Sequence, residues 1–143
     1  MISYRPYRKA YTIDEAIEEI SEKLGFNIPQ RWSIAHLYQA ILNGEEHVKD
    51  VDFIATLAAY VHWKLTGNKV IGVGEASGMF PIDSNTNDYD KKMLSQFDEK
   101  IADKNFPWNI EGILPKVLVA GENAGVLTEE GALLLDPTGE FKA

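Results

Sequence analysis

The sequence contains no cysteine, has few basic residues and has no long hydrophobic run, and each absence excludes a class of protein. Without cysteine there can be no disulfide framework, thiol nucleophile or cysteine-ligated zinc site, and the composition fits a reducing compartment. The 14 Lys and Arg residues are outnumbered by 22 Asp and Glu, so the net charge of −8 repels nucleic acid. Apolar runs such as Val117 to Ala120 are far shorter than the ~18 residues that span a bilayer.

What the chain does contain is the composition of an ordinary folded domain. Apolar residues make up 45% and charged residues 25%, which argues against disorder. A length of 143 residues suits one domain and is short for two. The segment from Met1 to Pro6 lacks the apolar stretch of a signal peptide. Together these features predict a soluble, acidic domain of the cytoplasm, with no membrane or nucleic-acid partner.

Several segments have the apolar spacing of amphipathic helices. The first has the clearest end signals, a capping box from Thr12 to Glu15 and a terminal Gly25. The third begins after Asp50 and ends at Gly67, and it is apolar over so much of its circumference that we expect it to be the most buried helix. The residues that we expect to cap the helices are Thr12, Ser33, Asp50, Asp88 or Asp90, and Thr128.

Only three short segments have strand character, near residues 2–4, 70–73 and 117–120. Three short strands make a marginal sheet, because a sheet usually needs more strands or a helical layer for independent stability. Two interpretations remain open: a helical domain with a small β ornament, or a sheet whose other strands lie outside this chain.

Motifs for metal or nucleotide chemistry are weak. His36, His47 and His62 do not have the spacing of a helical zinc site, which favours structural histidines. Adjacent acidic residues are typical of helix starts and solvated surfaces, and nothing selects a glycosidase-like pair among them. The glycine-containing stretches Gly72 to Gly78 and Gly121 to Gly125 match neither a dinucleotide fingerprint nor a P-loop. They are therefore not expected to hold the phosphates of ATP.

A group of aromatic and arginine residues is chemically more promising. Sugars are bound by aromatic faces together with polar groups that reach their hydroxyls, and Tyr4, Arg5, Arg8, Arg31 and Trp32 supply both. The alternative is that Trp32 packs as a hydrophobic staple while the arginines pair with the acidic first helix. Composition alone favours the packing interpretation.

Five short motifs nevertheless follow one another in a distinctive order. They are Leu65-Thr66-Gly67, Ala76 to Phe80, Tyr89-Asp90 with Met93-Leu94, Ile113-Leu114-Pro115, and Gly125 to Thr128. In this order and spacing the chain, from about Tyr4 to Gly139, resembles the N-terminal domain of the FGGY carbohydrate kinases, a family with xylulokinase- and glycerol-kinase-like members.

The resemblance implies a helix-rich α/β fold with few short strands. Residues 1–143 would form the C-terminal part of an actin-like, ribonuclease-H-like first domain, which is the sugar-binding domain. The implied activity is phosphoryl transfer from ATP, with Mg²⁺, to a sugar or polyol hydroxyl. The family's Asp-x-Gly-Thr phosphate hairpin would precede residue 1, and its catalytic-base aspartate would follow residue 143. The isolated chain is therefore expected to contain no catalytic residue, to bind neither ATP nor metal, and to be inactive.

The resemblance also implies which residues bind the substrate. Tyr4 and Arg8 match an aromatic and a basic position beside the sugar, and Arg31, just before Trp32, matches a position that lines the sugar pocket. Gly72 and Tyr89 depart from the family's usual Asp and Trp, so the sugar is not specified. The expected partners are the substrate and the remainder of the kinase. Association of copies through exposed strand edges, a self-contained helical interaction module and a metal-dependent hydrolase remain alternatives.

Overall fold

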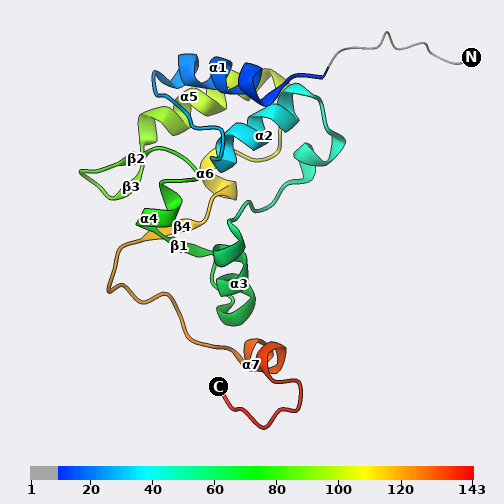
Figure 1. Cartoon of the computed structure of the whole chain (residues 1–143), viewed down its shortest axis with the longest axis vertical. Coiled ribbons are helices and arrows are strands. Elements are labelled where there is room, and N and C mark those ends of the chain that lie inside the picture. Colours follow the sequence, from blue (N-terminus) through cyan, green and yellow to red (C-terminus); the bar gives the residue numbers. More distant parts are fainter. Residues whose placement is uncertain (1–9) are drawn as a thin grey trace, which may run out of the picture.

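A computed structural model of the chain describes residues 10–143, and Figure 1 shows it. The helices are α1 (Ile13–Leu24), α2 (Ser33–Leu42), α3 (Leu57–Thr66), α4 (Val73–Ala76), α5 (Lys91–Ile101), α6 (Ile110–Ile113) and α7 (Glu129–Leu135). The strands are β1 (Val70–Gly72), β2 (Ile82–Asp83), β3 (Asp88–Tyr89) and β4 (Lys116–Leu118). Two short 3-10 turns, Glu46–Asp50 and Ala102–Lys104, complete the elements of the described part of the chain.

Local capping explains where several helices begin. At the start of α1 the Thr12 hydroxyl accepts a hydrogen bond from the Glu15 amide, and the Glu15 carboxylate accepts one from the Thr12 amide. Gly25 ends this helix in the left-handed conformation, with φ of 63°. The side chains of Asp90 and Thr128 cap α5 and α7 by accepting hydrogen bonds from the amides of Met93 and Gly131. The predictions for these three helices are confirmed.

The start of α2 differs from the prediction. Ser33 is the first helical residue rather than the cap, and Trp32 occupies the cap position without a side-chain hydrogen bond. The free amides of Ser33 and Ile34 instead donate to the carbonyl oxygens of Gly78 and Met79, at 3.3 and 3.1 Å. A distant segment of the chain thus satisfies the helix start, which no local pattern reveals.

The predicted third helix is shorter and more exposed than expected. It begins at Leu57 with Thr56 as its cap, because Asp50 ends a 3-10 turn and the Ile54 amide is bonded to the carbonyl oxygen of Ile113, at 2.8 Å. Ala59 is the only buried residue of α3, and Leu57 is 79% exposed. The prediction that this is the most buried helix is wrong, because the elements of residues 10–143 that contact α3, among them α7 and β1, leave Leu57, Tyr60 and Val61 exposed.

The strands form two separate pairs. β1 and β4 are parallel, with Val70 opposite Lys116 and Gly72 opposite Leu118, as the segments near residues 70–73 and 117–120 predict. β2 and β3 form an antiparallel hairpin that the sequence reading missed. Within the described residues, β1 and β4 each have a partner on one side only. The strand expected near residues 2–4 lies outside the described residues.

Two regions of the molecule differ in how completely their apolar residues are buried. The first, which we call the helical layer, consists of α1, α2, α5 and α6. In it α1 packs on α2 and α5, and Ile20, Ile34 and Phe97 are almost completely buried. The sheet-side half, defined as α3, β1, β4 and α7, extends away from this layer, with α7 packed on α3 (Figure 1). No helix formed by residues 10–143 is long and apolar enough to cross a membrane. The fold is a helix-rich α/β arrangement, as predicted.

Candidate functional site

The short motifs of the sequence meet in pairs in the fold. Thr128, at the end of the last motif, donates from its amide and its hydroxyl to the carbonyl oxygen of Leu65 in the first motif, at 3.0 and 3.2 Å. Gly131 follows in α7, where an added Cβ would lie 2.2 Å from the same carbonyl oxygen. This pair of motifs therefore docks α7 against the end of α3, which requires a residue without a side chain at position 131.

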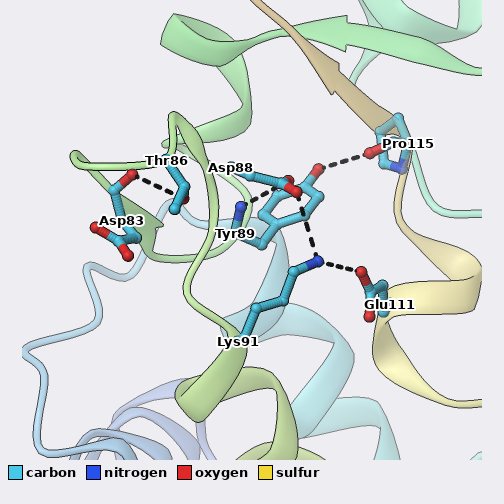
Figure 2. Close-up of polar contacts among 7 residues, drawn as sticks. All are labelled: Asp83, Thr86, Asp88, Tyr89, Lys91, Glu111 and Pro115. Atoms are coloured by element: carbon cyan, nitrogen blue, oxygen red, sulfur yellow. Dashed lines mark hydrogen bonds and ion pairs between the residues drawn. The ribbon is translucent and has the colours of Figure 1, made fainter.

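A second pair of motifs is joined by the buried side chain of Tyr89. Its hydroxyl donates to the carbonyl oxygen of Pro115 at 3.0 Å, as Figure 2 shows. Burial raises the pKa of Tyr89, so the hydroxyl keeps the proton that it donates. Beside it, Lys91 bridges Asp88 and Glu111, and the hydrogen bond to Glu111 is the main reason that the pKa of Lys91 is raised (Figure 2). The β2–β3 hairpin is thereby fastened to the segment that leads into β4.

The motif from Ala76 to Phe80 meets the start of α2. The hydrogen bonds from Ser33 and Ile34 to Gly78 and Met79 place Arg31 and Trp32 directly beside this motif. The backbone of Arg31 and Trp32 is thus positioned by a segment that lies more than forty residues further along the chain. Met79 and Phe80 are completely buried, which makes this attachment rigid.

Trp32 and Arg31 have different surroundings. The Trp32 ring is partly buried against the core, and its centroid lies 5.7 Å from that of Phe26. Arg31 is exposed, and its guanidinium has no hydrogen bond or ion pair with any residue of the described range 10–143. Within residues 10–143, the five guanidinium donors of Arg31 are thus not used by other residues, whereas the neighbouring Trp32 packs on the core. Tyr4 and Arg8 lie outside the described residues.

The packing alternative can be tested only for Trp32 and Arg31, because Arg5 and Arg8 lie outside the described residues. Trp32 does contact the core, although as the capping residue of α2. The ion pairs that α1 makes within residues 10–143 involve lysines: Lys23 contacts Glu99 at 3.0 Å, and Lys100 contacts Glu19 at 3.7 Å. Arg31 does not join them.

A hollow of the sheet-side half lies at the carboxyl ends of β1 and β4. This cavity, of about 520 Å³, is lined by α3, by Val70 to Glu75 and by the loop from Leu118 to Glu122. His62 lies in its wall, where its Nε2 is 2.8 Å from the carbonyl oxygen of Ala124. The other ionisable lining side chains are Glu75 and Glu122, which would repel phosphate groups. Residues 10–143 also contain no cluster of three or more His, Cys, Asp or Glu suited to a metal ion.

Comparison of the amino-acid sequence with protein-family models gives a match. The model of the N-terminal domain of the FGGY family of carbohydrate kinases matches residues 8–136. The chain belongs to the FGGY family of carbohydrate kinases. The resemblance seen in the sequence is confirmed, and this FGGY chain has the helix-rich α/β fold that the resemblance implies. Searches of curated proteins and of solved structures gave no match.

One residue of this loop in the FGGY chain was not anticipated. Phe26 contacts Trp32, although six positions separate the two in the sequence. The sequence feature that could have identified Phe26 is its place directly after Gly25, the residue that ends α1. A residue at this place is held at a fixed position by the hydrogen bonds of the helix end.

Proposed function

We propose that this chain is part of an ATP-dependent kinase that phosphorylates a hydroxyl group of a sugar or polyol. Arg31 and Trp32 form one wall of its sugar pocket, together with Tyr4 and Arg8. Family membership supports the reaction class. The observation that supports the assignment of the wall is that Arg31, exposed and unpaired within residues 10–143, directly precedes Trp32, whose ring packs against the core.

These two side chains have complementary roles toward a polyhydroxylated substrate. The planar guanidinium donates several hydrogen bonds in a fixed geometry and can hold two hydroxyl oxygens at once. The indole ring covers the apolar C–H groups of the substrate and excludes water from them. Both side chains bind and orient the substrate, and neither removes its proton.

The described residues do not fit a nucleotide. The glycine-containing segments line a cavity whose ionisable side chains are one histidine and two glutamates, without the lysine that a phosphate site uses. In the proposed kinase, ATP supplies the phosphoryl group, and ATP and Mg²⁺ are bound by other parts of the polypeptide. We derive no catalytic step from residues 10–143, and we expect the isolated chain to be inactive.

The surface of the sheet-side half supports the proposal that further polypeptide completes the domain. Leu57 is 79% exposed on α3, Leu134 is 63% exposed on α7, and β1 and β4 have one free edge each within the described residues. Exposed apolar side chains and open strand edges mark surfaces that another segment covers. In this proposal the cover is the remainder of a cytoplasmic kinase. Covering by a second copy, or by the partner of a helical interaction module, is the competing outcome.

The direct test is a kinase assay in which substrate and nucleotide dependence are separated. In a kinase that carries these 143 residues, Arg31→Ala should raise KM for the sugar at least about tenfold, because it removes a charged hydrogen bond to the substrate. KM for ATP should stay unchanged. Lys92→Ala is the matched control, because Lys92 is an exposed cation on α5 outside the loop. Equal effects of the two variants would contradict the role of Arg31, and phosphorylation of sugar by the isolated chain would contradict its proposed incompleteness.

A further inference from the structure

The backbone of Tyr11, which directly precedes the cap of α1, is held by two side chains of the α2 end. The Tyr11 amide donates to the side-chain oxygen of Asn43 at 2.7 Å. The Tyr11 carbonyl oxygen accepts from the side-chain amides of Gln39, at 3.1 Å, and Asn43, at 3.3 Å. We call this arrangement the Tyr11 clamp. It satisfies both backbone polar groups of one residue and so fixes the direction in which the chain enters α1.

The formation of α1 does not depend on the Tyr11 clamp. The capping box of Thr12 and Glu15 already fixes the first turn of this helix, and Ala16 and Ile20 bury its apolar face. Tyr11 lies outside the helix and is only partly buried. The three hydrogen bonds of the clamp therefore act on the chain that precedes the helix.

The clamp and the loop of Arg31 and Trp32 lie at opposite ends of the same helix. The clamp is at the C-terminal end of α2, whereas Arg31 and Trp32 directly precede its first residue. With 10 residues, α2 is about 15 Å long. Tyr4 precedes Tyr11 by seven residues, and a chain of that length spans at most about 24 Å. A chain held at the clamp is therefore long enough to bring Tyr4 back to the other end of α2.

We propose that the Tyr11 clamp positions Tyr4 and Arg8 for the substrate. This inference rests on the proposed sugar wall, of which Tyr4 and Arg8 are members. The clamp removes backbone freedom before the substrate binds, so less conformational entropy is lost when these two residues contact it. Gln39 and Asn43 are thus positioning residues, which act through the N-terminal chain and have no part in proton or phosphoryl transfer.

The test is steady-state kinetics of a kinase that carries these 143 residues. The probe is the substrate that the unaltered enzyme phosphorylates fastest among a panel of aldoses, ketoses and polyols. Asn43→Ala removes two of the clamp hydrogen bonds and should raise KM for this substrate about fivefold, the cost of ordering one freed backbone residue. Its kcat and its KM for ATP should stay unchanged. Asn85→Ala, at an exposed asparagine of the β2–β3 hairpin, is the matched control and should change none of these values.

A double-mutant cycle shows whether the clamp acts through Tyr4 and Arg8. In an enzyme that already carries Tyr4→Ala and Arg8→Ala, the further change Asn43→Ala should leave KM for the substrate unchanged, because the positioned side chains are gone. An equal rise of KM in both backgrounds would refute the positioning role. Gln39→Ala breaks a single clamp hydrogen bond and should raise KM by a smaller factor, which keeps the test decisive if Asn43→Ala fails to fold.

The outcomes also separate this inference from the proposal on which it rests. If Arg31→Ala raises KM for the substrate while Asn43→Ala and Gln39→Ala do not, the sugar wall stands and the role of the Tyr11 clamp is refuted. If none of these variants changes that KM, or if no member of the panel is phosphorylated, both are refuted. An equal rise of KM for ATP in Asn43→Ala would also refute the clamp, since a general loss of structure would then explain the effect.

Discussion

The helical layer and the sheet-side half are built from similar residues but reach different degrees of burial. In the helical layer, the apolar faces of α1, α2 and α5 meet one another, and Ile20 and Phe97 are fully buried. In the sheet-side half, α3 and α7 contact each other yet leave Leu57, Tyr60 and Leu134 exposed. Within residues 10–143, the first region therefore buries its apolar faces by itself, whereas the second leaves apolar side chains exposed, as the proposed need for further polypeptide expects.

The largest expected effect comes from truncating a side chain of the helical layer. Phe97 is fully buried, with edge-to-face contacts to Tyr38 and Phe80. Phe97→Ala should lower the free energy of unfolding by about 3–5 kcal/mol, because it removes apolar contacts and leaves a cavity. Leu134→Ala, in the sheet-side half, is the comparison variant and should change it by less than ~0.5 kcal/mol.

Urea unfolding of both variants, followed by circular dichroism, measures this contrast. Similar losses of stability in the two variants would show that Leu134 is covered in solution, and the division into two regions would then be wrong.

A methyl group at position 131 should weaken the contact between α7 and α3 in the sheet-side half and leave the stability of the helical layer unchanged. In Gly131→Ala the new Cβ would lie 2.2 Å from the carbonyl oxygen of Leu65, which is backbone and cannot move aside cheaply. The expected cost is about 1–3 kcal/mol. Because this loss of stability affects the contact between α7 and α3, amide hydrogen exchange should accelerate in residues 119–135 and stay unchanged in α1 and α5.

Gly112→Ala is a suitable control, because its added Cβ would meet only the Asn109 side chain, at 3.0 Å. Unchanged exchange in α7 of Gly131→Ala would indicate that the close approach to Leu65 does not exist in solution.

Tyr89→Phe tests the junction between the two regions. The substitution keeps the ring but removes the hydroxyl that donates to the carbonyl oxygen of Pro115, leaving a buried acceptor without a partner. We expect a loss of about 1–2 kcal/mol in urea unfolding. Thermal and urea transitions of both regions should shift together, since the hairpin holds the segment that connects α6 to β4. A change below ~0.3 kcal/mol would mean that water satisfies Pro115 and that the junction is open.

The smallest effect is a local pH dependence in the terminal turn. Hydrogen bonds from the Thr138 hydroxyl, and then from the amide of Phe141, lower the pKa of Asp136 from its ordinary value of 3.8. The hydrogen bonds of this turn should therefore persist above pH 3.8 and be lost as the pH falls through the lowered pKa. NMR titration of the Phe141 amide checks this: a midpoint at or above 3.8 would contradict it, and Thr138→Val should move the midpoint upward.

Local signals in the sequence predicted the elements that depend on local chemistry. The capping box at Thr12, the Asp90 and Thr128 caps and the end at Gly25 each involve residues within a few positions, so the pattern contains the whole interaction. Ser33 and Asp50 were wrong as caps, because Gly78, Met79 and Ile113 take part from far along the chain. The exposure of Leu57 could not be predicted from the sequence either, since helical periodicity identifies an apolar face but not the element that packs on it.

The candidate site was predictable only in part. The pairing of Leu65 with Thr128 spans 63 residues, and the motifs alone did not indicate that they meet. Arg31 and Trp32 were found from their residue types and the family resemblance, and the structure adds that Arg31 is unpaired within residues 10–143 and that Phe26 lies beside Trp32.

Residue-resolved hydrogen exchange on the 143-residue chain tests the division between the two regions most directly. Exchange reports the free energy of opening at each amide. We predict slow exchange in the middle of α1, α2 and α5, at the level of global unfolding, and exchange at least a hundredfold faster, a difference of about 2.7 kcal/mol, in α3, β1, β4 and α7. Uniform protection across both regions would contradict the account, because the sheet-side half would then be complete without any further partner.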